Sequence, residues 1–408
     1  MRILYICQYF VPPDASGGTR AYEMARRLVQ NGHKVTLLTS SAMLGNKFEL
    51  KSKINKINFN GIELLVLKLP YSNKVKFKKR ILIFFKFMLF TIFISLRHHH
   101  DLVFATSTPL TVALPGILLK TVKKRKFVFE VRDLWPEIPI AIGAIRSKVI
   151  IFLAKLLEQT AYNKADHIIS LSPDWKTKIC NSGIDKSKVT VISNSCDIEL
   201  FHPNNCRNSM PSYLQPFAGR KIVLYAGTFG KANGVDYLID IASLTRDTGE
   251  EEIVYLLVGS GMEEEILKEK AKNLGLHEKT VFFIPSTPKS EMPYLFKLAT
   301  ISCSIFIPLE ELWANSANKF FDSLAANTPI MINYGGWQKE IIENYGVGFV
   351  IPPSNPQIAV KVLIDNIKND NFLKEASQKC QDLAVNMFNR DMHAQKLEGI
   401  FKKTLFSH

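Results

Sequence analysis

Residues 2–39, RILYICQYFVPPDASGGTRAYEMARRLVQNGHKVTLLT, contain the pattern that decides the fold. The apolar stretch Arg2–Gln8 is typical of a strand, and a loop with two glycines follows it. A helical pattern then begins at Thr19 and ends at Asn31-Gly32, a pair typical of a helix C-terminus. Lys34–Thr39 is a second apolar strand. This order of strand, helix and strand predicts a βαβ unit and therefore a parallel sheet.

The same alternation continues along the chain in two series. The first has further strand candidates at Leu64–Leu67, Leu102–Ala105, Phe127–Glu130, His167–Leu171 and Val189–Ile192, and the second has them at Ile222–Ala226, Ile253–Val258, Val281–Ile284, Ile301–Phe306 and Ile330–Asn333. A proline-containing polar stretch at 211–220 separates the series. We therefore expect an α/β protein with Rossmann-like domains at 1–210 and 211–389. A helix at 390–408 is expected to return to the first domain.

Charge is distributed unevenly between the two halves. The net charge is +15, with 52 Lys and Arg against 37 Asp and Glu. Residues 1–205 hold 31 cations against 14 carboxylates, a net of +17, whereas the remainder holds 21 against 23, a net of −2. The basic half predicts an anionic partner, which could be nucleic acid, a lipid surface or a phosphorylated acceptor.

The cysteines and the first residues indicate the compartment. Six cysteines are scattered without a CxxC pair, a pattern that argues against a zinc ribbon or a disulfide framework and fits a reducing cytosol. The opening MRILYICQYF lacks the layout of a signal peptide. We therefore expect a cytoplasmic protein.

Glycine-containing loops follow several of the expected strands. Gly17-Gly18 precedes the first helix, where backbone N–H groups and the positive helix end can bind an anion. The second series opens with Gly227–Gly234, a loop that adds a cation, Lys231, suited to a diphosphate. Val258–Gly261 lacks the third glycine of a dinucleotide fingerprint, which disfavours a dehydrogenase.

A helix running into a strand is expected at Asn318–Ile330. Lys319 and Asp322 are three residues apart on this helix and, taken in isolation, indicate a surface ion pair. After the strand, Gly335 and Gly336 lead into another helix, as if a backbone turn lay against a ligand.

The order of these pieces resembles the family 4 retaining glycosyltransferases of GT-B fold over nearly the whole chain. The resemblance rests on Gly17-Gly18, Val131–Pro136 (VRDLWP), Asn194–Pro203 (NSCDIELFHP), Val258–Gly261 (VGSG) and Asn318–Ile330 (NKFFDSLAANTPI). It implies two Rossmann-like domains that face each other across a cleft, the first for the acceptor and the second for the nucleotide-sugar donor.

The resemblance also implies roles for individual residues. The implied donor-binding residues are Gly17, Gly18, Gly227, Thr228, Gly230, Lys231, Gly259, Ile284, Lys319, Asp322, Gly335 and Gly336. Arg132, Asp133 and Lys231 are the implied catalytic residues. Such enzymes usually need no metal, so we expect neither a metal nor a cofactor. The nucleotide-sugar is a co-substrate, and the subgroup resemblance favours UDP, with an N-acetylated or deoxy sugar as one option.

Three positions depart from the family pattern. Arg132 stands where many members have His. In this respect the chain resembles a subgroup of transferases that make capsule, O-antigen and colanic-acid-type polysaccharides. Asp322 replaces the ribose-binding Glu. Ala314 occupies the place of the first Glu of the acidic EX7E segment, although Glu310 and Glu311 lie nearby. The phosphate-binding Arg and Lys pair of the family is reduced to Lys231 in a shortened loop.

A basic stretch leads into the apolar run Ile81–Leu96 in the first domain. As a helix this run spans roughly 24 Å, too short for a hydrocarbon layer of about 30 Å, and Lys86 interrupts it. It is a buried helix of the first sheet, a helix that touches a membrane surface, or both, with one side packed and the Lys74–Arg80 stretch facing lipid. The expected membrane-contacting residues are Lys74, Lys76, Lys78, Lys79, Arg80, Phe84 and Phe85. His98-His99-His100, which follows the run, is expected to be an exposed loop end.

Two other functions are compatible with parts of the sequence. A GT-B-type sugar-nucleotide 2-epimerase shares the architecture, but Arg132–Pro136 and Asn194–Pro203 do not favour it. A nucleic-acid-binding protein is suggested by charge alone, yet the basic residues flank an apolar run and do not alternate with base-stacking aromatics. The favoured function is transfer of a sugar to a lipid-linked saccharide, with a polyprenyl diphosphate as the expected lipid carrier, in O-antigen or capsule synthesis. The protein is expected to be peripheral on the inner face of the cytoplasmic membrane and bound to its anionic surface, without nucleic acid.

Overall fold

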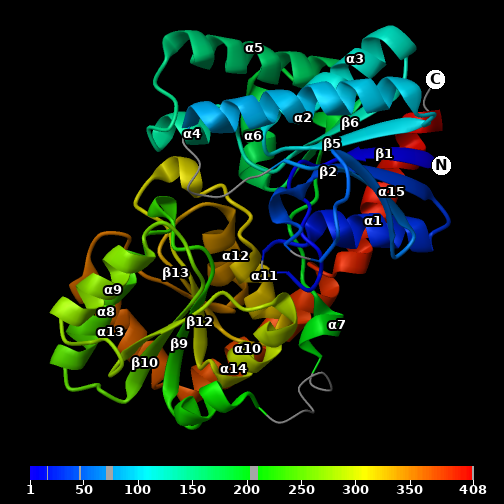
Figure 1. The fold of residues 1–408 in the computed structure, drawn as a ribbon. Helices are drawn as coiled ribbons and strands as arrows, with labels where there is room; N and C mark the ends of the chain where they lie inside the picture. Colours follow the sequence, from blue (N-terminus) through cyan, green and yellow to red (C-terminus); the bar gives the residue numbers. More distant parts are fainter. Residues whose placement is uncertain (16, 46, 70–76, 203–209, 407–408) are drawn as a thin grey trace. The chain divides into compact units, whose positions relative to one another are not determined.

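The computed structural model describes residues 1–408 apart from 16, 46, 70–76, 203–209 and 407–408. The chain forms two compact units (Figure 1): unit 1 is Met1–Ser193 with Asp391–His408, and unit 2 is Asn194–Arg390. This division falls before the boundary at 210 that the sequence suggests. The difference arises because the segment after Ser193 packs within unit 2, where the Cys196 N–H donates to the Phe388 carbonyl over 2.8 Å.

Unit 1 is built on an eight-stranded sheet with the order β3-β4-β2-β1-β5-β6-β7-β8. Its strands are β1 (Arg2–Ile6), β2 (Lys34–Ser40), β3 (Ile54–Phe59), β4 (Ile62–Leu67), β5 (Leu102–Thr106), β6 (Lys126–Val131), β7 (His167–Ser170) and β8 (Val189–Val191). Every neighbouring pair is parallel except β3 with β4. The parallel sheet expected from residues 2–39 is therefore confirmed, and β3 is an additional antiparallel edge strand.

Helices cover both faces of this sheet (Figure 1). The helices of unit 1 are α1 (Arg20–Gln30), α2 (Phe77–Arg97), α3 (Ala113–Lys123), α4 (Glu137–Ala141), α5 (Lys148–Lys164), α6 (Pro173–Asn181) and α15 (Arg390–Phe406). One face packs against α1 and α15 in a shared apolar core. The opposite face carries α3, whose Gly116 abuts the Phe127 ring, and α5, whose Tyr162 ring centroid lies 6.3 Å from that of Phe129.

The last helix, α15, completes the core of unit 1. Ala394, Leu397 and Phe401 are buried among side chains of β1, β2 and α1. The Phe401 ring centroid lies 5.1 Å from that of Phe104 in β5. Polar contacts add to this packing, because Glu398 accepts a hydrogen bond from Asn31 over 2.6 Å. α15 is thus an integral layer of unit 1.

Unit 2 is built on a six-stranded parallel sheet with the order β11-β10-β9-β12-β13-β14. Its strands are β9 (Lys221–Ala226), β10 (Ile253–Val258), β11 (Val281–Ile284), β12 (Ile301–Ser304), β13 (Ile330–Ile332) and β14 (Gly348–Val350). Its helices are α7 (Ile198–Phe201), α8 (Val235–Asp247), α9 (Glu264–Asn273), α10 (Met292–Leu298), α11 (Asn318–Ala325), α12 (Trp337–Tyr345), α13 (Pro356–Ile367) and α14 (Asp370–Asn386). One apolar core joins the sheet to α8, α9 and α13, and a second joins it to α10, α11, α12 and α14.

The apolar run at 81–96 lies within α2, which is longer than the sequence suggests. Its inner side chains Ile83, Phe87, Phe90 and Ile94 are buried. The interpretation of this run as a buried helix of the first sheet is therefore confirmed for one of its faces. In the described part of the chain, no helix combines the length and apolarity needed to cross a membrane.

A carboxyl group on α5 titrates far from its ordinary range. Partial burial and, to a lesser extent, the nearby Glu137 carboxylate raise the pKa of Glu158 from 4.5 to about 7, against a hydrogen bond from Tyr162 and the charge of Lys155. The folded state therefore prefers the protonated form. The stability that Glu158 contributes is complete below its unfolded pKa of 4.5 and is lost as the pH rises through about 7.

Replacing Glu158 with Gln should remove this loss. At pH 8 we expect Glu158→Gln to be more stable than wild type by about 1–3 kcal/mol, and at pH 4 we expect the two to be equal. Urea unfolding at the two pH values measures the difference. Glu265→Gln on α9, whose side chain is exposed, is the control and should show no such change. Equal stabilities of Glu158→Gln and wild type at pH 8 would contradict the assignment.

Candidate functional site

In unit 2, the loops that follow β9 and β10 are joined by backbone hydrogen bonds. The Gly227 N–H donates to the Val258 carbonyl and the Phe229 N–H to the Ser260 carbonyl, both over 2.9 Å. A Cβ on Gly259 would overlap the Gly227 carbonyl oxygen, and Gly259 has φ +154. These glycines are therefore required first of all for the close approach of two loops.

Lys319, near the start of α11, extends beneath the loop after β9. Its Nζ lies 4.9 Å from the Tyr225 ring centroid and 5.6 Å from that of Phe306. Gly227 leaves room for the lysine, because a Cβ there would overlap the Lys319 Cε. β9 and β12 are neighbours in the sheet, with β10 and β11 on one side and β13 and β14 on the other. Lys319 thus lies at the carboxyl ends of the two strands where the strand order changes direction, the usual ligand position in such folds.

The charge of Lys319 is costly to hold in these surroundings. Burial lowers the pKa of its ammonium group to about 8, although the charges of Cys303 and Asp322 act in the opposite direction. No carboxylate of the described residues forms an ion pair with it. The faces of the two aromatic rings supply partial compensation through cation–π attraction. The site therefore contains a cation that forms no ion pair with a carboxylate of the described residues.

Asp322 is paired with a lysine that the sequence analysis did not single out. Its Oδ1 lies 2.6 Å from the Nζ of Lys289, and both side chains are nearly buried. The expectation of a surface ion pair between Lys319 and Asp322 is wrong, because the two side chains of α11 have different surroundings. Lys289 is 33 residues away in a short 3-10 turn, and no local pattern connects it with Asp322.

The other residues expected at the donor site lie near the same strand ends. Lys231 is exposed and follows Gly230 directly. The carbonyl of Thr228 accepts a hydrogen bond from Tyr225 Oη over 2.8 Å. The carbonyl of Ile284, at the end of β11, accepts from the Gly259 N–H over 3.0 Å. Hydrogen bonds thus connect the carboxyl ends of β9, β10 and β11 into one surface.

Packing within unit 2 explains why the first residue of the Gly335-Gly336 turn is a glycine. A Cβ on Gly335 would lie 2.7 Å from Cε3 of the Trp313 ring. Gly336 has φ +77 and caps α12. Packing against Trp313 therefore explains Gly335 without a ligand. Ala314, the position of the missing acid, is buried, so the described structure offers no carboxylate there.

In unit 1, the ends of β5 and β6 hold Arg132 and Asp133. The backbone N–H of Arg132 donates to Ser107 Oγ over 2.9 Å. The hydroxyl of Thr108 donates to Asp133 Oδ2 over 3.0 Å. Both residues are partly exposed. The loop after β5 thus positions the two expected catalytic residues side by side.

Arg20 and Glu130 form a buried ion pair that the sequence analysis missed. The Arg20 Nη2 lies 2.8 Å from Glu130 Oε1, and its guanidinium also donates to the carbonyls of Ile192 and Ser193. Thr106 donates to the other carboxylate oxygen over 2.6 Å. Burial would raise the pKa of Glu130, but Arg20 and these hydrogen bonds hold it below its ordinary value. The pair fastens α1 to the sheet and to the chain segment that leaves unit 1.

Gly17 and Gly18 precede this anchored helix. Gly17 is exposed and has φ +133, a conformation that favours glycine. Gly18 is partly exposed, and Thr19 occupies the position before α1. The two glycines lie at the positive end of an eleven-residue helix. A role in anion binding stays a prediction for both.

The stretch Asn194–Pro203 has a structural role in its described part. The side-chain amide of Asn194 donates to the Ser316 carbonyl over 2.6 Å. Asp197 pairs with Arg390 at 3.3 Å, and Arg390 also donates to the Ser195 carbonyl over 3.1 Å. The two segments that connect unit 2 to unit 1 are therefore fastened to each other. Pro203 lies outside the described residues.

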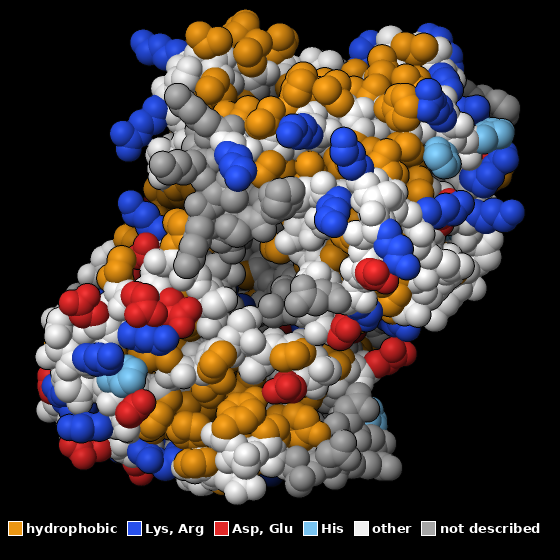
Figure 2. All heavy atoms as spheres, in the orientation of Figure 1, with side chains coloured by type: hydrophobic (Ala, Val, Ile, Leu, Met, Phe, Trp, Pro, Cys, Tyr) orange, Lys and Arg blue, Asp and Glu red, His pale blue; other side chains and the backbone are white. Residues whose placement is uncertain are grey.

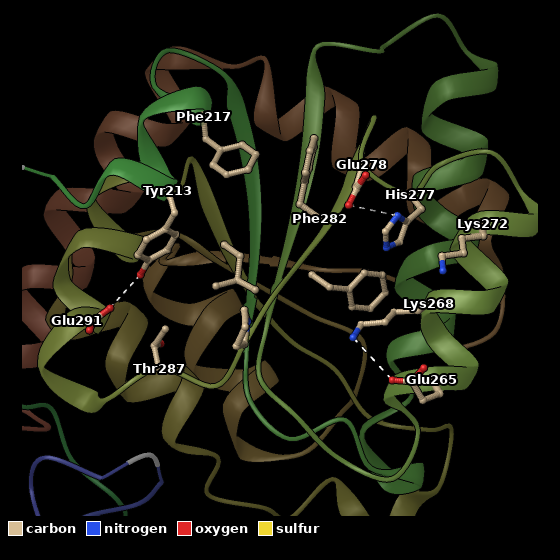
Figure 3. A pocket seen from close by; sticks show the side chains of 13 residues that line it. Tyr213, Phe217, Glu265, Lys268, Lys272, His277, Glu278, Phe282, Thr287 and Glu291 are labelled. Carbon is tan, nitrogen blue, oxygen red and sulfur yellow. Dashed lines mark hydrogen bonds and ion pairs between the residues drawn. The ribbon is translucent and has the colours of Figure 1, made fainter.

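A cavity of about 800 Å³ lies at the edge strand β11 (Figure 3). Phe282, His277 and Tyr213 are among the side chains around it. Of the expected donor residues only Ile284 lines this cavity, and neither Lys319 nor Asp322 does. We therefore place the candidate site at the carboxyl ends of β9 and β12, where the unpaired cation lies.

Comparisons with known proteins identify the family. A model of the Glycosyltransferase Family 4 matches residues 17–200, and a model of Glycosyl transferases group 1 matches residues 210–383. The chain is a family 4 glycosyltransferase. The family resemblance seen in the sequence is thereby confirmed, and so is the expectation of a transferase.

Individual relatives agree with this assignment. The glycosyltransferase is 25% identical over 310 residues to the probable glycosyltransferase WbjE of Pseudomonas aeruginosa, covering 74% of each chain. It is 23% identical to WcaI of Escherichia coli K12, whose name associates it with colanic acid biosynthesis, over 47% of each chain.

A solved structure shows the same fold. The structure of HepE from Anabaena in complex with UDP-glucose has a TM-score of 0.73 and 17% identity to the glycosyltransferase, covering 99% of this chain and 100% of that chain. The two α/β units with parallel sheets belong to the GT-B class, as expected.

The residues expected to touch a membrane are only partly described in this glycosyltransferase. Lys74 and Lys76 lie outside the described residues, and so do the side chains of Lys78 and Arg80. Lys79 and Phe85 are exposed on α2, whereas Phe84 is partly buried.

The histidines after α2 differ from the expectation of an exposed loop end. His100 is buried, and this burial lowers its pKa to about 4. Only His99 is fully exposed. Within the described ranges, no group of His, Cys, Asp and Glu is arranged to hold a metal ion.

Removing the Arg390 cation should destabilise the glycosyltransferase. Arg390→Met leaves the nearly buried Asp197 carboxylate without its cation, which costs about 3–5 kcal/mol in comparable buried pairs. Urea unfolding measures the loss. Lys339→Met breaks an exposed pair with Glu343 and should cost less than about 0.5 kcal/mol. Similar small effects of both substitutions would show that the Arg390 pair does not hold these segments.

Proposed function

We propose that this enzyme is a retaining glycosyltransferase that moves a sugar from a UDP-sugar to a lipid-linked saccharide in surface polysaccharide synthesis, of the O-antigen or capsule type. The observation that carries the proposal is the unpaired ammonium group of Lys319 at the carboxyl ends of β9 and β12. A donor diphosphate supplies the anion that this site lacks.

The proposed roles in unit 2 follow from the chemistry of each side chain. Lys319 and the exposed Lys231 bind the diphosphate and stabilise the negative charge that develops as it leaves. Lys289 holds one oxygen of Asp322, and the second accepts a hydrogen bond from the ribose. Gly227, Thr228, Gly230, Gly259 and Ile284 form the surface on which the nucleotide rests, with Gly335 and Gly336 at its border.

Arg132 and Asp133 in unit 1 are assigned to the transferred sugar and the acceptor hydroxyl. The Arg132 backbone N–H donates a hydrogen bond to the Ser107 hydroxyl, and the Thr108 hydroxyl donates one to the Asp133 carboxylate. Gly17 and Gly18 are assigned to the donor phosphate. No metal is needed in this scheme, because lysine cations neutralise the leaving group.

The choice of donor and acceptor rests on the relatives. The Anabaena structure contains UDP-glucose, and the name of WcaI refers to colanic acid, a surface polysaccharide. The family matches favour a transferase over an epimerase. The net charge of +17 on residues 1–205 favours an anionic surface as partner. We therefore propose a peripheral location on the inner face of the cytoplasmic membrane.

Removing the charge of Lys319 should weaken donor binding. Lys319→Met keeps the length of the side chain but loses a charge-assisted interaction of about 1.5–3 kcal/mol, so the Kd for UDP should rise roughly 10- to 150-fold at pH 7. Titration calorimetry measures it. Lys339→Met on α12 is the control and should bind UDP like wild type. An unchanged Kd in Lys319→Met would remove this lysine from the donor site.

The affinity of wild type for UDP should also depend on pH. Since the free ammonium group of Lys319 has a pKa of about 8 and a bound anion stabilises its charged form, the affinity should fall as the pH rises above about 8. Lys319→Met should lack this fall. The same decline in both proteins would assign the pH dependence to another group.

Lys231 should contribute to the rate of transfer. Lys231→Ala is expected to slow sugar transfer roughly 10- to 150-fold, because one charge-assisted contact to the leaving diphosphate is lost. The assay follows UDP release together with glycosylation of a lipid-linked saccharide. Lys339→Ala should keep the wild-type rate. A wild-type rate in Lys231→Ala would exclude it from the mechanism, and UDP release with 2-epimerised sugar as the only other product would favour the epimerase.

A further inference from the structure

The helix α5 carries an apolar face that nothing in the described structure covers. Val149, Phe152, Leu153 and Leu156 follow the spacing i, i+3, i+4 and i+7 of a single helix face. This spacing is typical of a face that packs on apolar surroundings, yet Val149 is 67% exposed and Phe152 is 66% exposed. No residue from Lys148 to Thr160 is buried. Val149, Phe152, Leu153 and Leu156 therefore lie in solvent along one side of α5.

The helix α2 has a second apolar face of the same kind. Its buried face contains Ile83, Phe87, Phe90 and Ile94, whereas Leu82, Phe85, Leu89 and Phe93 are exposed on its outer side, Phe85 at 52%. α2 and α5 both pack against α3, so they lie on the same side of the sheet of unit 1 (Figure 1). Figure 2 shows hydrophobic side chains gathered over these helices, with Lys and Arg among them. We call the eight exposed side chains of the two helices the α2–α5 face.

The charges on these helices select the kind of partner. The sequence of α2 contains five Lys and Arg, that of α3 two and that of α5 three, whereas Glu158 is the single carboxylate in the three sequences. A second copy of this chain would bring cations against cations if it docked by the same face. Nucleic acid would leave the outward phenylalanines and leucines without an apolar partner. A bilayer with anionic headgroups satisfies both the apolar side chains and the cations that border them.

We propose that the α2–α5 face inserts into the headgroup region of an anionic lipid bilayer, with α5 as a second anchor beside α2. Each helix lies along the surface and does not span the membrane, its apolar side chains reaching the acyl boundary and its lysines meeting lipid phosphates. The inference deepens the proposed function and rests on it for its purpose, because a lipid-linked acceptor remains at the bilayer surface. Its physical basis, the exposed apolar face of unit 1, is separate from the donor site in unit 2.

Vesicle flotation tests the proposal on the full-length protein. Vesicles of phosphatidylglycerol mixed with phosphatidylcholine should bind the wild type at low salt. Phosphatidylcholine alone should bind it more weakly, and high salt should reduce the electrostatic part of the binding. The double variant Phe152→Glu/Leu156→Glu on α5 should lower the partition coefficient at least about 10-fold, since two apolar side chains that would enter the bilayer become charged. Phe85→Glu/Leu89→Glu on α2 should lower it by a similar factor.

A matched control replaces exposed apolar residues of unit 2. Ile266 on α9 and Ile358 on α13 are 60% and 49% exposed, and Ile266→Glu/Ile358→Glu should bind vesicles like wild type. All variants should keep the wild-type thermal midpoint and the wild-type Kd for UDP, which shows that they fold and that the donor site is intact.

Each other outcome has a definite meaning. Wild-type binding by the α5 variant would remove α5 from the membrane surface. Failure of the wild type to bind anionic vesicles would overturn the whole proposal. A wild-type dimer that the α5 variant converts to a monomer, without vesicle binding, would assign the face to a second copy and overturn it as well. Vesicle binding by a wild type that binds no UDP-sugar would reject the proposed function and leave this inference standing.

Discussion

The ammonium group of Lys319 lies where a charge is unfavourable, and residues at the carboxyl ends of β9 and β12 surround it. Burial lowers its pKa, and aromatic rings of Tyr225 and Phe306 offer only partial compensation. The lysine fits because Gly227 has no side chain. The loop of Gly227 in turn requires Gly259 beneath its carbonyl oxygen. The Lys319 side chain thus accounts for Gly227, and the close approach of the two loops accounts for Gly259.

Several buried charges of the described residues differ from Lys319 in having partners. Arg20 and Glu130 satisfy each other and the carbonyls around them, and Asp197 pairs with Arg390. Such closed sets fix helices and connecting segments in place but leave nothing for a ligand to bind. The Asp322 carboxylate is satisfied only in part, because Lys289 donates a hydrogen bond to one of its two oxygens. Charged side chains whose hydrogen-bonding groups are all paired within the protein therefore stabilise the fold. Those with unpaired groups can bind a ligand.

Most strands of the two sheets could be predicted from the sequence, because buried parallel strands are continuous apolar runs. β3 was missed because INKINF mixes lysine and asparagine with its apolar residues, as expected of an antiparallel edge strand, and β14 has only three residues. The glycine loops and Lys319 were also identified, since their order along the chain is a local property.

The contacts between distant residues could not be predicted in the same way. Arg20 meets Glu130 across 110 residues, and nothing in either segment indicates the other. The glycine at 335 suggested a ligand, but its neighbour is the Trp313 ring, which only the folded chain brings there. The apolar face of α5 was invisible for a related reason: an apolar helix pattern predicts burial, and only the structure shows that no other element covers it.

The position of α15 also affects how the protein can form during synthesis. Ala394, Leu397 and Phe401 belong to the core of unit 1, although the whole of unit 2 is translated before them. At about 5–20 residues per second, the ribosome needs roughly 10–40 s to make Asn194–Arg390. During this interval the side chains of β1, β2 and α1 that α15 covers in the folded protein lack this cover. The core of unit 1 therefore cannot be completed until the residues of unit 2 have been made.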